Sequence, residues 1–386
     1  MSRYLFSSHD GFGLGHVRRN SLIAKAILDT EPDAEVILVT GLAVRPAWLE
    51  HTGIRTVRVP ALLKDTDGAY RHADLPFEQA IAQRATAFRT TVESFRPDVV
   101  VIDRHPYGTA GELRSGLDLA RRAGAAVVLG LRDVLDEPSQ VRAELAGDGW
   151  AGVADVFDEV LVYGSEVLCD HVSEYGLPVR PRYCGWVVGH PTPARRENGL
   201  LVVTAGGGGD GANVFKLGVG LARALPNRHT ILVAGPYAAD HRMSDDPALA
   251  GRIELKRDVP GCGDLFARAD AVVQMAGYNS TVESLAAGIR PVLVPRRSPR
   301  REQAIRASRL TALGLADMVD EGAPADEVAW LLNRSRLLAD GQLSAAGLEL
   351  DGAHTAAAAL SRLAQAPLMI RARCRPPSRR GARGLA

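Results

Sequence analysis

Short apolar runs alternate with stretches of helical periodicity along almost the whole chain. The apolar runs are rich in Val, Ile and Leu, and the stretches between them repeat apolar positions at the spacing of an amphipathic helix. Apolar strands separated by helices are typical of parallel sheets that carry helices on both faces. Strands are therefore predicted at residues 4–8, 35–39, 54–59, 99–103, 126–131, 159–163, 200–204, 230–234, 252–255, 271–275, 291–295 and 316–319, and helices at residues 17–28, 77–95, 110–123, 213–225, 325–338 and 345–364.

The alternation pauses near the middle of the chain. Residues 189–199 hold two prolines, several polar side chains and no periodicity, which is typical of a linker. A length of 386 residues, at roughly 150 residues per domain, indicates two or three domains. We predict an N-terminal Rossmann-like domain over residues 1–190 and a second Rossmann-like domain over residues 199–366. Residues 367–386, which are rich in arginine, are expected to form a disordered basic tail.

Composition and charge exclude several classes of protein. The net charge of +1 produces no overall field that would attract nucleic acid. The four cysteines are scattered without a C-x-x-C pair, so neither a metal cluster nor a disulfide framework is expected. No apolar stretch reaches the ~18 residues that a transmembrane helix needs. We predict a cytoplasmic protein with no cofactor, no nucleic-acid partner and no transmembrane segment, while the basic tail leaves peripheral membrane contact open. The sequence does not indicate the oligomeric state.

Two glycine-rich loops each follow a predicted strand and precede a predicted helix. They are Gly11-Phe12-Gly13-Leu14-Gly15-His16 and the loop at residues 206–211. A backbone without Cβ atoms at a helix N-terminus favours an anion such as phosphate. Neither loop contains the Gly-Lys-Ser/Thr of a Walker loop, and the first lacks the spacing of a dinucleotide-binding fingerprint. We therefore expect two nucleotide-fold domains that face each other across a cleft, and we do not expect hydride transfer.

The most specific stretch covers residues 270–295 and reads as strand, glycine turn, helix, glycine stop and strand. With the segment 296–310, it resembles the donor-nucleotide half of GT-B glycosyltransferases, and in particular family 28, the MurG-type enzymes. Gly13-Leu14-Gly15-His16 matches that family's first glycine loop. The resemblance implies an α/β protein with the GT-B fold, in which two Rossmann-like parallel-sheet domains face a cleft. It also implies an inverting hexosyltransferase that takes a nucleotide-sugar donor, with UDP or dTDP, and a hydroxyl-bearing acceptor. Metal independence is expected from the sequence itself, because no spacing of His, Cys and Asp residues suggests a set of metal ligands.

The same resemblance implies a set of donor-binding residues. Glu283 matches the acid that accepts hydrogen bonds from the two ribose hydroxyls, although Ser280-Thr281-Val282-Glu283 is also a capping box in which Glu283 would close its own helix. Glycine-loop and helix-start donors would bind the diphosphate, a backbone position would hold the base, and the start of a later helix would contact the sugar. The expected set is Gly207, Gly208, Gly209, Val259, Gly277, Asn279, Ser280, Glu283, Glu302 and Gln303.

On the acceptor side, His16 opens the first predicted helix and faces the cleft. A neutral imidazole can take the proton of an acceptor hydroxyl, although a histidine there can also make local cap contacts. Asp10 is either a rival base or the group that orients His16. Ligands of open α/β sheets bind at the carboxyl ends of the strands, where a catalytic Asp103 is a further alternative. The acceptor-side candidates are Gly13, Gly15, Asp103, His105 and Glu112, and no metal ligands are expected.

Two other functions are compatible with these features. A nucleotide-sugar epimerase or hydrolase of the same fold would replace the acceptor by substrate re-addition or by water. A non-catalytic protein that binds sugar nucleotides would keep the glycine loops without turnover. The acceptor itself is not indicated, because that half of the cleft is predicted to consist of irregular loops.

Overall fold

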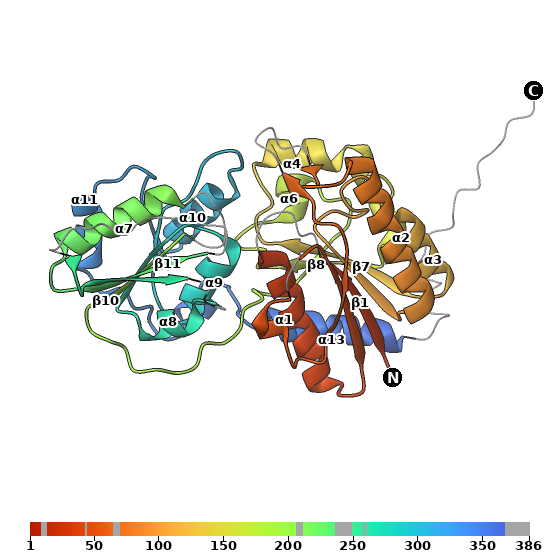
Figure 1. Ribbon diagram of the computed structural model, residues 1–386, viewed down its shortest axis with the longest axis horizontal. Helices are drawn as coiled ribbons and strands as arrows, with labels where there is room; N and C mark the ends of the chain where they lie inside the picture. The colour runs from red at the N-terminus through yellow and green to blue at the C-terminus, as the bar shows by residue number, and fades with distance from the viewer. Residues whose placement is uncertain are drawn as a thin grey trace, which may run out of the picture.

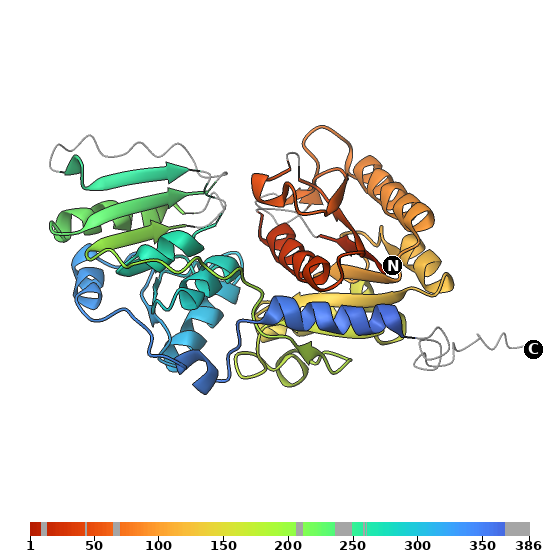
Figure 2. The same ribbon diagram turned by 90° about the horizontal axis from the view of Figure 1, so that it is seen from below.

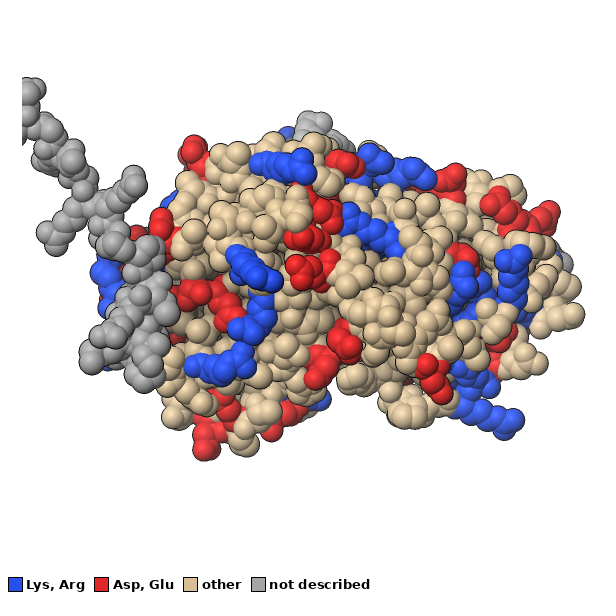
Figure 3. Space-filling model, turned by 180° about the vertical axis from the view of Figure 1, so that it is seen from behind, with Lys and Arg blue, Asp and Glu red and all other residues tan. Residues whose placement is uncertain are grey.

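The chain forms two parallel sheets, one in each half, with helices packed on both faces of each (Figure 1). The computed structural model describes residues 1–8, 14–42, 45–64, 70–205, 211–235, 249–257, 259 and 261–366. No helix of these residues is both long and apolar enough to cross a bilayer. On the face shown in Figure 3, acidic and basic side chains are interspersed.

The first sheet has seven strands in the order β3-β2-β1-β6-β7-β8-β9, all parallel. Every residue of β6 is buried, which is why its sequence is continuously apolar up to Asp103. Helices α2 and α3 pack together on one face, and α1 packs on the other. The strands are β1 (Arg3–Ser7), β2 (Glu35–Thr40), β3 (Arg55–Arg58), β6 (Val99–Asp103), β7 (Ala126–Arg132), β8 (Glu159–Tyr163) and β9 (Arg182–Tyr183). The helices are α1 (Gly15–Thr30), α2 (Phe77–Phe95), α3 (Arg114–Arg122), α4 (Pro138–Leu145), α5 (Val153–Val156) and α6 (His171–Tyr175), with 3-10 turns at Ala47–Leu49 and Asp148–Trp150 and a short antiparallel pair, β4 (Leu63–Lys64) and β5 (Tyr70–Arg71).

The second sheet has six parallel strands in the order β12-β11-β10-β13-β14-β15. Its central strand β10 is buried along its whole length. The strands are β10 (Leu200–Thr204), β11 (His229–Ala234), β12 (Ile253–Arg257), β13 (Ala271–Gln274), β14 (Val292–Leu293) and β15 (Asp317–Met318). The helices are α7 (Ala212–Ala224), α8 (Gly263–Arg268), α9 (Tyr278–Ala286), α10 (Glu302–Ala312), α11 (Ala325–Leu332), α12 (Gln342–Ala345) and α13 (Gly352–Gln365).

The last helix, α13, packs on the first sheet rather than the second (Figure 2). Its buried residues, such as Ala356 and Leu360, lie in the same apolar core as β1 and β6, and α13 packs along α1. A Cβ atom on Gly352 would lie 2.4 Å from the carbonyl oxygen of Gly185, so the close approach of the two segments requires a glycine. The predicted boundary at residue 366 therefore differs from the packing, because α13 belongs by its contacts to the N-terminal half. The sequence pattern identified an amphipathic helix, but periodicity does not say which sheet a helix covers.

Candidate functional site

A histidine and an aspartate meet at the carboxyl end of the first sheet. His16 lies in the first turn of α1, which follows strand β1, and Asp103 is the last residue of the neighbouring central strand β6. His16 Nδ1 lies 2.9 Å from Asp103 Oδ2. The structure thus brings together two of the predicted acceptor-side residues, and the aspartate beside the imidazole is Asp103.

Asp103 is buried, with a relative exposure of 2%, and is surrounded by donors. Arg19 Nη2 lies 2.7 Å from Oδ1, and Asn20 Nδ2 lies 3.2 Å from Oδ2. Burial alone raises the pKa of Asp103, but the positive charge of Arg19 and the contact with His16 outweigh burial and hold it well below the usual range. Two groups lie near His16 Nδ1: Asp103 Oδ2 at 2.9 Å and Arg19 Nη2 at 3.1 Å. An ionised carboxylate only accepts hydrogen bonds, so the shorter contact favours the tautomer that donates through Nδ1–H and leaves the lone pair on Nε2.

Two residues of this cluster, Arg19 and Asn20, did not emerge from the sequence. They follow His16 by three and four positions, so all three side chains lie on one face of α1. Arg19 is itself buried, and its guanidinium carbon lies 5.3 Å and 5.5 Å from the ring centres of Tyr163 and Tyr278. The i, i+3, i+4 spacing from a candidate histidine is the signal that could have identified them.

Glu283 is buried in the second half of the chain, with a relative exposure of 5%. Its Oε2 accepts a hydrogen bond from the backbone N–H of Cys262 at 2.9 Å, and its Oε1 lies 2.8 Å from Arg18 Nη2 of α1. Burial raises the pKa of Glu283, and the charge of Arg18 and the Cys262 N–H partly offset this rise. Arg18 also packs against Gly261, where a Cβ atom would lie 2.0 Å from Arg18 Nη2.

The capping-box alternative for Glu283 is wrong. Helix α9 begins at Tyr278 with Gly277 as its N-cap, so the third helical residue is Ser280 and Glu283 lies a turn further on. The Glu283 carboxylate points away from its own helix start, toward the Cys262 N–H and Arg18. The sequence misplaced the helix start because Ser280 is a stronger N-cap residue type than Gly277.

The N-termini of α1 and α9 lie next to each other. Asn279 Nδ2 is 3.4 Å from the carbonyl oxygen of Gly15, and a Cβ atom on Gly15 would lie 3.0 Å from Asn279 Nδ2. The Ser280 hydroxyl is 3.4 Å from the carbonyl oxygen of Gly277. Four predicted residues therefore lie where these two helices begin and where the positive ends of both helix dipoles meet. They are Gly15, Gly277, Asn279 and Ser280.

Glu302 and Gln303 are the first two residues of α10, and both are buried. Glu302 Oε1 lies 2.9 Å from Arg296 Nη2, and Gln303 Oε1 is 3.5 Å from the backbone nitrogen of Arg296. Burial raises the pKa of Glu302, but Arg132 and Arg296 outweigh it and hold the pKa at about 2. Glu302 is therefore a buried, ionised carboxylate at the start of α10.

Over most of its length, the chain is similar to known glycosyltransferases. No protein-family model matches the chain. An N-acetylglucosamine transferase of Paenarthrobacter aurescens, which carries the MurG-type name UDP-N-acetylglucosamine--N-acetylmuramyl-(pentapeptide) pyrophosphoryl-undecaprenol N-acetylglucosamine transferase, is 27% identical over 347 residues, covering 84% of this chain and 86% of its own. The MurG structure of Acinetobacter baumannii superimposes with a TM-score of 0.55 at 15% identity, covering 94% of this chain and 98% of its own. The chain is a GT-B glycosyltransferase.

Other glycosyltransferase structures share the fold over nearly their whole length. The glycosyltransferase of kitacinnamycin superimposes with a TM-score of 0.61 at 17% identity, covering 97% of this chain and 99% of its own. A transferase from Siraitia grosvenorii, solved in complex with UDP, gives a TM-score of 0.59 at 12% identity, covering 94% of this chain and 100% of its own. The predicted fold class and the resemblance to the MurG-type enzymes are confirmed.

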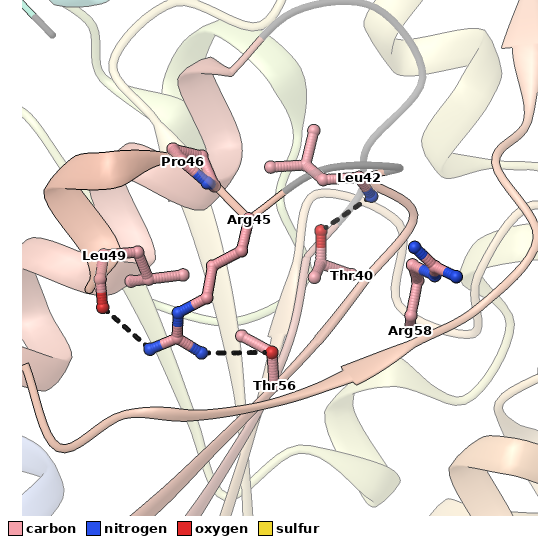
Figure 4. A pocket seen from close by; sticks show the side chains of 7 residues that line it. All are labelled: Thr40, Leu42, Arg45, Pro46, Leu49, Thr56 and Arg58. Carbon is pink, nitrogen blue, oxygen red and sulfur yellow. Dashed lines mark hydrogen bonds between the residues drawn. The ribbon is translucent and has the colours of Figure 1, made fainter. Parts of the chain in front are cut away.

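The remaining acceptor-side candidates of the glycosyltransferase lie on the loop that follows β6. His105 Nδ1 is 3.6 Å from Glu144 Oε1. Glu112 is buried, 3.1 Å from both Arg84 Nε and the backbone nitrogen of Ala110, so its carboxylate holds the loop together. A cavity of about 250 Å³ lies at the same end of the sheet, beyond β2 and β3 (Figure 4). It is lined by Thr40, Leu42, Arg45, Pro46, Leu49, Thr56 and Arg58.

Several predicted residues lie outside the described parts of the glycosyltransferase. These are Asp10, Gly13, Gly207, Gly208 and Gly209, together with the basic tail. Val259 is described and half-buried, and its role at the base stays a prediction. Among the described residues, no group of His, Cys, Asp and Glu is placed to hold a metal ion, and metal independence also stays a prediction.

A buried ion pair joins the two halves of the glycosyltransferase. Asp133, directly after β7, faces Arg306 of α10 at 2.6 Å and 2.9 Å, and both side chains are fully buried. Trp186 Nε1 donates to Asp133 at 3.2 Å, and Arg306 Nη1 donates to the carbonyl oxygen of Ala276 at 2.8 Å. Burial raises the pKa of Asp133, but Arg306 outweighs it and lowers the pKa below the usual value. This pair was not predicted, because its members are 173 residues apart.

Proposed function

We propose that this glycosyltransferase moves a sugar from a nucleotide-diphosphate sugar, with UDP or dTDP, to an acceptor hydroxyl, with inversion at the anomeric carbon. The observation that carries the proposal is the His16–Asp103 pair beside the adjoining N-termini of α1 and α9. A base and an anion site a few residues apart on one helix are what a single displacement from a diphosphate requires.

In the proposed reaction, the acceptor hydroxyl gives its proton to Nε2 of His16 while its oxygen attacks the anomeric carbon. The bond between that carbon and the diphosphate oxygen breaks, and the diphosphate leaves with the bonding electron pair. Asp103 stabilises the imidazolium that forms, as a buried carboxylate hydrogen-bonded to Nδ1–H does in catalytic triads. Attack on the side opposite the leaving group inverts the configuration.

The donor would lie between Glu283 and the two helix N-termini. Glu283 offers two carboxylate oxygens to the vicinal ribose hydroxyls. Gly277, Asn279 and Ser280 would place donors and the dipole of α9 at the diphosphate, and the loop at Gly207–Gly209 would approach from the other side. The presence of UDP in the name of the P. aurescens relative and in the S. grosvenorii complex supports a uridine nucleotide.

Glu302 and Gln303 would face the donor sugar from the start of α10. Glu302 is ionised, and its Oε1 is already bound to Arg296. Its second oxygen, Oε2, is buried and has no hydrogen-bond partner among the described residues. We therefore expect Oε2 to accept hydrogen bonds from hydroxyl groups of the donor sugar. Gln303 would supply the adjoining amide.

The test is a screen of UDP-, dTDP-, GDP- and ADP-sugars for thermal stabilisation, followed by product analysis with and without a panel of hydroxyl acceptors. We expect stabilisation by UDP- or dTDP-sugars and sugar transfer only when an acceptor is present. Release of free sugar or of an epimerised donor without acceptor would instead identify a hydrolase or an epimerase. Tight nucleotide binding with neither outcome would identify a binding protein.

A further inference from the structure

Two arginines lie at the carboxyl end of the first sheet beside the His16–Asp103 pair. Arg104 directly follows Asp103, and Arg132 is the last residue of the neighbouring strand β7. The backbone nitrogen of Arg104 donates to the carbonyl oxygen of Gly130 at 2.9 Å, which fixes the two strand ends against each other.

Arg104 is held in an unusual position. Its φ is +74°, in the left-handed region that residues with a Cβ atom rarely adopt, and only 4% of the residue is exposed. One guanidinium nitrogen, Nη2, lies 3.0 Å from Glu144 Oε2. The other, Nη1, is buried and has no hydrogen-bond partner among the described residues. A buried donor without a partner destabilises a protein, so this N–H group is expected to serve a ligand.

Arg132 is similarly unsatisfied. Its Nη2 donates to the carbonyl oxygen of Leu135 at 3.3 Å, and its Nε is buried without a partner among the described residues. Burial lowers the pKa of Arg132 to about 10; the attraction of Glu302 opposes this shift, and the repulsion of Arg104, Arg306 and Arg300 adds to it. Arg132 thus lies among like charges.

Each carboxylate near Arg132 is already paired with a different arginine. Glu144 faces Arg104, Glu302 faces Arg296, and Asp133 faces Arg306. Within the described parts of the chain, no carboxylate lies at ion-pair distance from Arg132. The place is therefore short of one negative charge.

We propose that Arg104 and Arg132 bind an anionic group, a carboxylate or a phosphate, that the substrate carries at its sugar or acceptor end. The inference rests on the proposed function, and it names a substrate class for the same cleft. The position follows from the neighbours: Asp103 belongs to the catalytic pair, and Glu302 begins the helix expected to face the donor sugar. A guanidinium pair matches the planar, bidentate geometry of such an anion.

Two sources could supply the group: a uronic acid as the transferred sugar, or an acidic acceptor. The first arm of the experiment measures UDP-glucuronate and UDP-glucose affinities by calorimetry for the full chain and for Arg132→Gln. If the sugar carries the anion, UDP-glucuronate binds about tenfold more tightly than UDP-glucose, and Arg132→Gln removes the difference. Arg297→Gln is the matched control, because Arg297 is half-exposed and paired with Asp320 on the adjoining loop.

The second arm titrates inorganic phosphate into the protein saturated with UDP. If the acceptor carries the anion, the two UDP-sugars bind equally, phosphate binds at one site, and Arg132→Gln weakens phosphate binding about tenfold while Arg132→Lys retains part of it. Equal affinities for both UDP-sugars, together with phosphate binding that is absent or unchanged in Arg132→Gln, would overturn the proposal.

Different results would contradict the proposed function and the anion site. Failure of the wild-type protein to bind UDP would contradict the proposed function. In that case, phosphate titrated into the unliganded protein still tests Arg132, with the same comparison of Arg132→Gln and Arg297→Gln.

Discussion

Asp103 fixes the proton on the imidazole of His16, so the two residues act on the same proton transfer. We expect His16→Ala to lower turnover by about 10²–10⁴-fold, the usual range for loss of a general base. The affinity for the nucleotide should hardly change, because the expected nucleotide contacts lie mainly in the second half of the chain. Steady-state kinetics and calorimetry on the same preparation separate the two quantities.

Asp103→Asn should lower turnover as well, and the double variant should be little worse than His16→Ala alone, because residues that act as a unit are not additive. Asp10→Asn is the control for the rival base. If Asp10→Asn abolishes turnover while His16→Ala stays near wild type, the assignment to His16 is wrong.

Glu283 is the residue through which nucleotide affinity should be changed. Glu283→Gln keeps the shape of the side chain but removes its charge, and losing charged hydrogen bonds to the ribose should weaken nucleotide binding by about 1.5–3 kcal/mol. Calorimetry with UDP measures this change. Glu254→Gln, at a half-exposed position on β12, is the control. Unchanged affinity in a folded Glu283→Gln variant would contradict ribose binding.

The sequence was most informative for features that a short stretch of residues determines by itself. The strand at residues 99–103 could be predicted because an unbroken apolar run is buried on both faces, and Glu283 could be chosen because the residues around it match a known unit. The His16–Asp103 contact could not be derived, because 87 residues separate its members and only the order of the strands brings them together. The buried N–H groups of Arg104 and Arg132 that lack a partner among the described residues could not be derived either, because they depend on how the side chains pack.

At the scale of elements, helix α1 carries both the proposed base and a competitor for the nucleotide. Arg18 of α1 lies 2.8 Å from Glu283 Oε1, the oxygen expected to bind ribose. Binding of the nucleotide must therefore break or rearrange this ion pair. We expect Arg18→Ala to bind UDP more tightly by about 1 kcal/mol, the worth of a partly exposed pair, and Arg18→Lys to stay near wild type.

Calorimetry with UDP at two salt concentrations checks this expectation. Salt screens the ion pair, so the difference in UDP affinity between Arg18→Ala and wild type should be smaller at the higher salt concentration. Weaker binding by Arg18→Ala would show that Arg18 contacts the nucleotide itself.

The adjoining N-termini of α1 and α9 bear on metal dependence. Two helix dipoles can stabilise a departing diphosphate without a cation, so transfer should survive excess EDTA. An activity assay with EDTA and with added Mg²⁺ or Mn²⁺ checks this. The chain contains the Asp-x-Asp sequence Asp65-Thr66-Asp67, outside the described residues. Complete loss of activity in EDTA, restored by Mn²⁺ and abolished in Asp65→Asn, would overturn metal independence.

At the scale of the whole molecule, the Asp133–Arg306 pair holds the two halves together. Breaking a buried ion pair from one side costs about 3–5 kcal/mol, because the remaining charge stays buried. We expect Arg306→Met to lower the free energy of unfolding by that amount in urea titrations. Arg122→Met, at an exposed position of α3, should change it by less than about 0.5 kcal/mol.

The same pair predicts a pH dependence. The pKa of Asp133 is lower in the folded protein than in the unfolded chain, so its contribution to stability is fully present above the ordinary carboxylate pKa and is lost as the pH falls below it. Urea titrations between pH 7 and pH 3 should show a smaller acid-induced loss in Asp133→Asn than in wild type. An equal loss in both would mean that other carboxylates dominate acid unfolding.

The return of α13 to the first sheet affects the order in which the molecule is completed during synthesis. Residues 1–190 leave the ribosome first, yet the apolar face of α1 is covered by a helix that ends at Gln365. The core around α1 can therefore be covered by α13 only after the whole second sheet has been made. We therefore expect the N-terminal half to reach its final packing after the strands of the second sheet have been synthesised.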